Sequence, residues 1–259
     1  MLNNILRKEI VDLIVRGNGG HIPSAFSIVD IINTIYDKIL RYNLTNPDDE
    51  KRDYFILSKG HGCAALYAVL HKFGFLSDED MGSYLKYNGI LGGHPDRTKI
   101  PGAEASTGSL GHGLSYAMGI AHGLRIKNME NKVYVVVGDG ECHEGTIWET
   151  ALVAQNFNLG NLCCIVDLNG SSEQILPHPS IEKQWKSFGW DTVVIDGHDP
   201  KQIEATLLSF RDSNNQKPLT VIANTIKGKG LSFMEGHGPW HYKVPNEDEY
   251  KVIIEKLNL

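Results

Sequence analysis

The chain has 259 residues, of which 41% are hydrophobic and 22% charged, with a formal net charge of −6. These values are typical of a globular protein with one large domain, so we expect a single domain over residues 1–259. The sequence has no basic run, which argues against a nucleic-acid surface. No apolar run is long enough to span a membrane. The four cysteines form no CxxC pair and the N-terminus has no signal-like core, which favours a cytoplasmic protein with reduced thiols.

The N-terminal half alternates between helical and extended hydrophobic patterns. Apolar residues at helical spacing predict a first helix that ends at Gly17. Ser27, with Asp30 three residues later, predicts the start of a second helix over residues 28–40. The next elements are expected to be a strand at residues 54–57, a helix at residues 62–73 and a glycine-rich stretch at residues 89–113. That stretch is long for a passive connection, which favours an ordered binding loop.

The C-terminal half contains continuous apolar runs typical of buried strands. These runs lie at residues 133–137, 162–166, 192–195 and 220–223. The expected helices lie at residues 149–157, 200–211 and 246–259. Because helix-length segments separate the strands, the crossovers should be parallel. The sequence therefore predicts an α/β fold, with a parallel sheet that carries helices on both faces.

Polar residues follow two of these predicted strands. The sequence Gly-Asp-Gly at 138–140 follows one strand, and Asn169 closes an Asp-Leu-Asn triplet after the next. An Asp-Gly pair that stands alone after a strand is more often a turn. Here, however, glycine backbone at a strand end suits a diphosphate. The Asp139 carboxylate, the Asn169 amide and a backbone carbonyl such as that of Ser171 would suit its Mg²⁺ ion.

This arrangement resembles the thiamine diphosphate signature of the transketolase family, in which GDG is followed at the next strand end by an asparagine. Glu144 matches a glutamate of the same loop in the family. Further segments resemble family blocks in the same order: GNGGHIPSAFS, RDYFILSKGHGCAALY, GGHPD, STGSLGHGLS, LPHPSIEKQWKSFGWDTVVIDGHD and NTIKGKGLSFMEGHGPWHYKVPNE. Agreement over most of the chain is far more specific than any single motif.

The resemblance implies thiamine diphosphate chemistry, with transfer of a two-carbon ketol unit from a ketose or ketose phosphate to an aldose acceptor. The implied ligands of Mg²⁺, or of Ca²⁺ or Mn²⁺ in its place, are Asp139, Asn169 and the carbonyl of Ser171. The implied cofactor contacts are Lys59, His61, Gly108, Leu110, Gly140, Glu144, Lys227 and His241. The groups implied to bind sugar hydroxyls or to move protons are His21, His94 and His241.

Ordinary structural roles compete with several of these assignments. A lone histidine near glycines is more often a hydrogen-bonded loop residue than a catalyst, although four in matching blocks favour function. His237 could serve in place of His241, and Lys59 and Lys227 could be solvated surface lysines. Supporting roles at most are expected for His112 and His143. Packing roles are expected for Trp148, Trp185 and Trp190.

The resemblance covers only the first of the three transketolase domains. In the family, the second domain carries the glutamate that activates the cofactor, and nothing after Asn246 could supply it here. We therefore expect a companion subunit with the pyrimidine-binding domain, and an assembly with two copies of each chain. Two alternatives remain: an α-type subunit of a thiamine diphosphate-dependent decarboxylase or dehydrogenase, and a cofactor-binding partner without catalysis.

Overall fold

The computed structural model describes residues 3–46, 49–173, 175–177, 180–236 and 238–257. These residues contain a five-stranded sheet in the order β1-β2-β3-β5-β4, and every pairing is parallel. The strands are β1 (Tyr54–Leu57), β2 (Val133–Gly138), β3 (Leu162–Leu168), β4 (Asp191–Asp196) and β5 (Leu219–Asn224). The predicted strands are confirmed, each within two residues of its expected ends.

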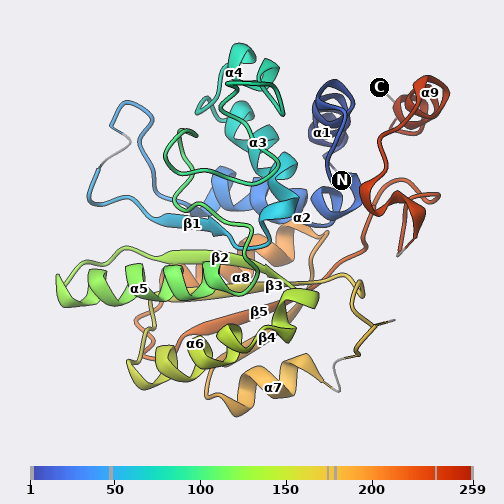
Figure 1. Ribbon diagram of the computed structural model, residues 1–259. Coiled ribbons are helices and arrows are strands. Elements are labelled where there is room, and N and C mark those ends of the chain that lie inside the picture. Colours follow the sequence, from blue (N-terminus) through green and yellow to red (C-terminus); the bar gives the residue numbers. More distant parts are fainter. Residues whose placement is uncertain (1–2, 47–48, 174, 178–179, 237, 258–259) are drawn as a thin grey trace.

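Helices cover both faces of the sheet (Figure 1). The core on one face is formed with α2 (Ile22–Thr34), α3 (Cys63–Lys72) and α8 (Pro200–Arg211), and α1 (Asn4–Gly17) packs on α2 and α3. The other face packs against α5 (His112–Ile126), α6 (Gly145–Asn156) and α7 (Ile181–Ser187). The shorter α4 (Asp78–Gly82) and the terminal α9 (Glu247–Lys256) complete the helices named here. No helix within the described ranges is long and apolar enough to cross a membrane.

The apolar strands divide their side chains between two cores. In β2, Val133, Val135 and Val137 enter the core beneath α5 and α6, whereas Tyr134 and Val136 enter the core beneath α2 and α3. Because successive side chains of a strand point to opposite faces, both sets must be apolar when helices cover both faces. The tryptophans pack as expected: those at 185 and 190 are buried, with ring centroids 4.9 Å apart.

The second helix differs from its prediction. It begins at Ile22, with Pro23 in the first turn, where a missing N–H costs nothing. Ser27 is therefore buried inside the helix and does not cap it, and Asp30 forms an ion pair in place of a capping box. The last turns, Ile35–Ile39, are a π-helix in which the Leu40 N–H bonds to the Ile35 carbonyl at 2.8 Å. Helix α5, which follows the binding loop, has no counterpart among the predicted elements.

A buried ion pair joins α1 to α2. The Arg7 guanidinium donates to both carboxylate oxygens of Asp30, at 3.0 and 2.7 Å, and both side chains are at most 3% exposed. Burial opposes ionisation of Asp30, but hydrogen bonds from His198 and Arg7 outweigh it and lower its pKa to about 2. The carboxylate is therefore charged at all ordinary pH values, and it depends on its partners for compensation.

Replacing Arg7 by methionine should destabilise the fold. We expect Arg7→Met to lower the free energy of unfolding by about 3 kcal/mol, because it leaves a buried carboxylate without its cation. Urea denaturation measures this loss. The matched control is Lys8→Met, which removes the partly exposed pair with Asp12 and should cost less than about 1 kcal/mol. Equal losses in the two variants would contradict the assigned role of the buried pair.

Candidate functional site

A cavity of about 520 Å³ lies at the carboxyl ends of β2 and β3. Its volume is in the range of small-molecule sites, and this edge of a parallel sheet is where ligands bind. The predicted site residues that line it are Lys59, His61, Leu110, Asp139, Gly140, Asn169, Ser171, Lys227 and His241. The fold thus brings together residues that lie up to 182 positions apart, from 59 to 241.

The two predicted metal-ligating side chains lie at adjacent strand ends. Asp139 follows β2, is 2% exposed, and accepts the Gly140 N–H at 2.7 Å. Burial raises its pKa, and the neighbouring charge of Asp167 adds to this rise. Asn169 follows β3; its Oδ1 accepts the Ser171 N–H at 3.0 Å and its Nδ2 donates to Asp167 at 2.9 Å. The Asn169 amide is therefore held in one orientation. A cation at these strand ends would stabilise the ionised carboxylate of Asp139.

Asp167 is a buried charged residue beside the cavity to which the sequence reasoning assigned no role. It is fully buried at the end of β3, and its carboxylate forms an ion pair with Lys59. Ser27 Oγ donates to the same carboxylate at 2.7 Å, and Thr225 Oγ1 donates to its other oxygen. Lys59 is only 1% exposed, so it is not a solvated lysine. The available signal was a charged residue at the end of an otherwise apolar strand.

Lys227 also lines the cavity and is 2% exposed. Its ammonium donates to Ser171 Oγ at 2.7 Å and lies 2.9 Å from Nδ1 of His241. Burial lowers the pKa of Lys227, and the nearby charge of Lys59 lowers it further. Among the described residues, no carboxylate comes within ion-pair distance of this ammonium. An anion in the cavity would supply that missing charge. The alternative histidine, His237, lies outside the described residues.

Glu141 is a second residue that the sequence reasoning missed. It is 2% exposed, and its carboxylate accepts hydrogen bonds from Ser58 Oγ, from the Gly111 N–H at 2.8 Å and from the Gly138 N–H at 3.1 Å. These donors come from the loops after β1, before α5 and at the end of β2. Glu144, the predicted cofactor contact, is exposed before α6 and does not line the cavity.

Predicted histidines cluster beside the cavity, which His61 and His241 line and His21 and His94 do not. The His21 ring lies 5.3 Å from that of His61 and 5.1 Å from that of His241. His94 packs on Gly108, where a Cβ atom would come within 2.9 Å of its ring. Burial, aided by the charges of neighbouring groups, lowers the pKa of His21 to about 4 and that of His61 to about 2. Both are therefore neutral imidazoles near pH 7, able to donate and accept hydrogen bonds.

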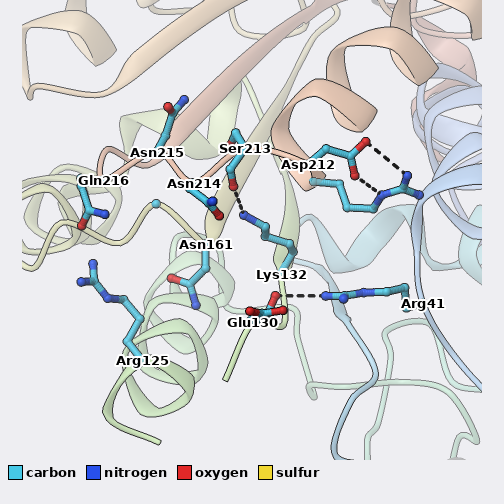
Figure 2. Close-up of a pocket in the computed structure, with 12 residues that line it drawn as sticks. Arg41, Arg125, Glu130, Lys132, Asn161, Asp212, Ser213, Asn214, Asn215 and Gln216 are labelled. Carbon is cyan, nitrogen blue, oxygen red and sulfur yellow. Dashed lines mark hydrogen bonds and ion pairs between the residues drawn. The ribbon is translucent and has the colours of Figure 1, made fainter. Parts of the chain in front are cut away.

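A second cavity, of about 490 Å³, lies at the opposite edge of the sheet (Figure 2). Its charged groups already have partners in the structure. Arg211 pairs with Asp212, and the Lys132 ammonium donates to the Ser213 carbonyl at 2.9 Å. Arg41 donates to the Glu130 carbonyl at 3.0 Å. None of the predicted site residues lines this cavity, so the carboxyl edge of the sheet is the candidate site.

Residues 1–259 match the family model described as transketolase, thiamine diphosphate binding domain. The chain is 37% identical over 257 residues to one of the subunits of apulose-4-phosphate transketolase from Phocaeicola vulgatus, covering 97% of this chain and 91% of that protein. It is 34% identical to a 6-deoxy-6-sulfo-D-fructose transketolase subunit of a Clostridium species, covering 98% and 94% of the two chains. Human transketolase is 33% identical over 98% of this chain but only 41% of its own length.

Solved structures agree with these sequence matches. Transketolase from Leishmania mexicana has a TM-score of 0.91 at 26% identity, covering 98% of this chain and 40% of that one. Transketolase from Campylobacter jejuni has a TM-score of 0.90 at 28% identity, covering 99% and 42%. The cavity at the carboxyl edge of the sheet lies within the matched region. The chain therefore belongs to the transketolase family, within which it corresponds to the thiamine diphosphate-binding domain.

Proposed function

We propose that this chain is the diphosphate- and metal-binding subunit of a two-chain transketolase. The assembly would transfer a two-carbon ketol unit from a ketose or its phosphate to an aldose or its phosphate. One observation carries the proposal: the same cavity is lined by Asp139, whose pKa burial raises, and by the buried Lys227, whose pKa burial lowers and whose ammonium forms no ion pair with a carboxylate of the described residues. A metal ion beside the first group and a diphosphate beside the second would stabilise both.

The donor set fits a magnesium diphosphate better than a metal held by protein alone. Asp139, the Oδ1 of Asn169 and the carbonyl of Ser171 would hold Mg²⁺, with Ca²⁺ or Mn²⁺ as substitutes. No three His, Cys, Asp or Glu side chains gather as a metal cluster in the described part of the chain. Phosphate oxygens and water would therefore complete the coordination. Gly140 faces the cavity without a side chain, which lets a diphosphate approach its backbone.

The remaining residues divide between cofactor and substrate. Thiamine diphosphate, when bound, supplies a carbon nucleophile and an electron sink. We assign His61 and the two buried lysines to its diphosphate, and Gly108 and Leu110 to its rings. His21, His94 and His241 would bind sugar hydroxyls and move protons; this is supported by their clustering and by the lowered pKa of His21.

A companion chain is supported by the lengths of the relatives. Two proteins named as transketolase subunits are covered over 91% and 94% of their length, whereas human transketolase is covered over 41%. We propose that the companion carries the pyrimidine-binding domain of the family. The four cysteines are buried and free of disulfides, which supports a cytoplasmic location.

Self-association would then give two copies of each chain. One face of α5 presents exposed Tyr116 and Ile126, with open space above Gly119 and Gly123 between them. These positions lie three and four residues apart, on one side of the helix. Exposed Leu152 and Phe157 extend the apolar surface onto and just beyond α6. A second copy of this chain is the occupant that we propose for this surface.

Removing the carboxylate of Asp139 tests the metal site. Asp139→Ala should abolish Mg²⁺-dependent binding of thiamine diphosphate by the assembled complex, because the metal loses its charged protein ligand. Calorimetric titration with and without Mg²⁺ measures the affinity. The exposed Asp191, at the start of β4, supplies the control Asp191→Ala, which should bind as wild type. An affinity of Asp139→Ala within about threefold of wild type, under 1 kcal/mol, would refute the assignment.

Purified alone, the chain should not catalyse ketol transfer. The test supplies thiamine diphosphate, Mg²⁺, a ketose donor and an aldose acceptor, first without and then with the companion chain. Turnover should appear only with both chains, and light scattering should report a four-chain species. Robust turnover by this chain alone would overturn the two-chain proposal. Cofactor binding without turnover in the full complex would instead support a non-catalytic partner.

His61 should make the ligand-free fold sensitive to acid. Its pKa is about 2 in the folded chain and about 6.5 when unfolded. Its contribution to stability is therefore present above pH 6.5 and is lost as pH falls toward 2. Between pH 7.5 and pH 4.5 the loss that His61 contributes should be about 3 kcal/mol. Urea titrations should show a correspondingly smaller loss for His61→Asn, while the control His122→Asn should behave as wild type. Equal pH dependence in all three proteins would contradict a neutral, buried His61.

A further inference from the structure

The backbone around Lys227 is held by side chains that lie outside the cavity. Immediately before it, the Ile226 N–H donates to Nε2 of His198 at 2.9 Å. Two residues after it, the carbonyl of Lys229 accepts a hydrogen bond from Nε of Arg7 at 2.9 Å. Neither His198 nor Arg7 lines the cavity. The lysine that reaches into the cavity is thus flanked on both sides by anchored backbone.

The anchors belong to one buried network. Nδ1 of His198 lies 3.0 Å from Oδ2 of Asp30, and the two side chains are 7% and 3% exposed. Because Nε2 accepts the Ile226 N–H, the proton of the neutral ring must be on Nδ1, which donates to Asp30. Asp30 is in turn held by both terminal nitrogens of Arg7. The imidazole therefore has a single orientation, in which it offers one acceptor to the segment that carries Lys227.

The backbone of the turn that follows Lys227 is also fixed. The Gly228 N–H donates to the Pro23 carbonyl at 3.0 Å, and Gly228 has a φ of +80°. A Cβ atom there would come within 2.3 Å of the Met234 carbonyl oxygen. Before Lys227, the Thr225 N–H donates to the Leu168 carbonyl at 3.1 Å, and the Ile226 N–H is held by His198. Without the bond to His198 the Ile226 N–H is left unpaired, and the backbone between Thr225 and Lys227 can shift.

We propose that His198 is a positioning residue for Lys227. By holding the Ile226 N–H it sets the point from which the Lys227 ammonium enters the cavity, where this ammonium bonds to Ser171 and His241. The inference rests on the proposed function, in which Lys227 binds the diphosphate. His198 acts through Lys227 and touches no ligand itself. Moving the Lys227 ammonium by about 1 Å would strongly weaken its interaction with a bound ligand.

A double-mutant cycle tests this dependence. The affinity of the assembled complex for thiamine diphosphate with Mg²⁺ is measured by calorimetry for wild type, His198→Ala, Lys227→Met and the double variant. We expect Lys227→Met to weaken binding at least tenfold, and His198→Ala to weaken it three- to tenfold. In the Lys227→Met background, His198→Ala should add less than twofold, because the group that it positions is gone. His198→Gln keeps one donor and one acceptor and should restore most of the affinity.

Two controls separate positioning from general stability. Val133→Ala, a buried substitution at the far end of β2, should lower the melting temperature yet leave the affinity unchanged. If His198→Ala does not fold, Gly228→Ala disturbs the same segment directly and should show the same non-additivity with Lys227→Met. Unchanged affinity in Lys227→Met would overturn the proposed role of Lys227 itself. A clear loss in Lys227→Met, with either no loss in His198→Ala or fully multiplicative losses in the double variant, would overturn only the positioning role.

Discussion

The buried carboxylate of Asp167 is the constraint on which the site depends. An ionised carboxylate without water is tolerated only when charge and hydrogen bonds compensate it. Here the compensation comes from Lys59 after β1, Ser27 within α2, Asn169 after β3 and Thr225 after β5. Each donor brings its own element to the same edge of the sheet. The contacts to Asp167 thus fix the position of Asn169, a candidate metal ligand, and of Lys59, a candidate diphosphate contact.

Helix α2 links this constraint to a second buried charge. Ser27 donates to Asp167, and Asp30, three residues later, pairs with Arg7 and His198. Residues three apart share one side of a helix. The same face of α2 therefore contacts both Asp167 and the buried pair of Arg7 and His198. Both polar residues lie inside the helix, where they stabilise contacts between elements that are distant in the sequence. They do not cap the helix.

The cavity lining carries groups of both signs, which suits a metal diphosphate. The lining contains both a carboxylate whose pKa is raised, that of Asp139, and a lysine whose pKa is lowered, Lys227. His61, which lines the cavity, and His21 beside it are neutral near pH 7, because burial and nearby positive groups disfavour their charged forms. Neutral imidazoles can exchange protons and hydrogen bonds with a sugar without adding further positive charge. The proposed transfer chemistry uses each of these features.

The sequence alone determined the parallel α/β fold, since continuous β-branched runs separated by helix-length segments allow little else. It also determined the candidate ligands Asp139 and Asn169, because they immediately follow such runs. Only the tertiary structure decided which charges are compensated. Asp167 carried one local signal, a charge at the end of an apolar strand, but the roles of Asp167, Glu141 and His198 depend on partners that lie 108, 83 and 168 positions away. The start of α2 was likewise decided by tertiary contacts, since burial of Ser27 against Asp167 outweighed its local preference for a cap.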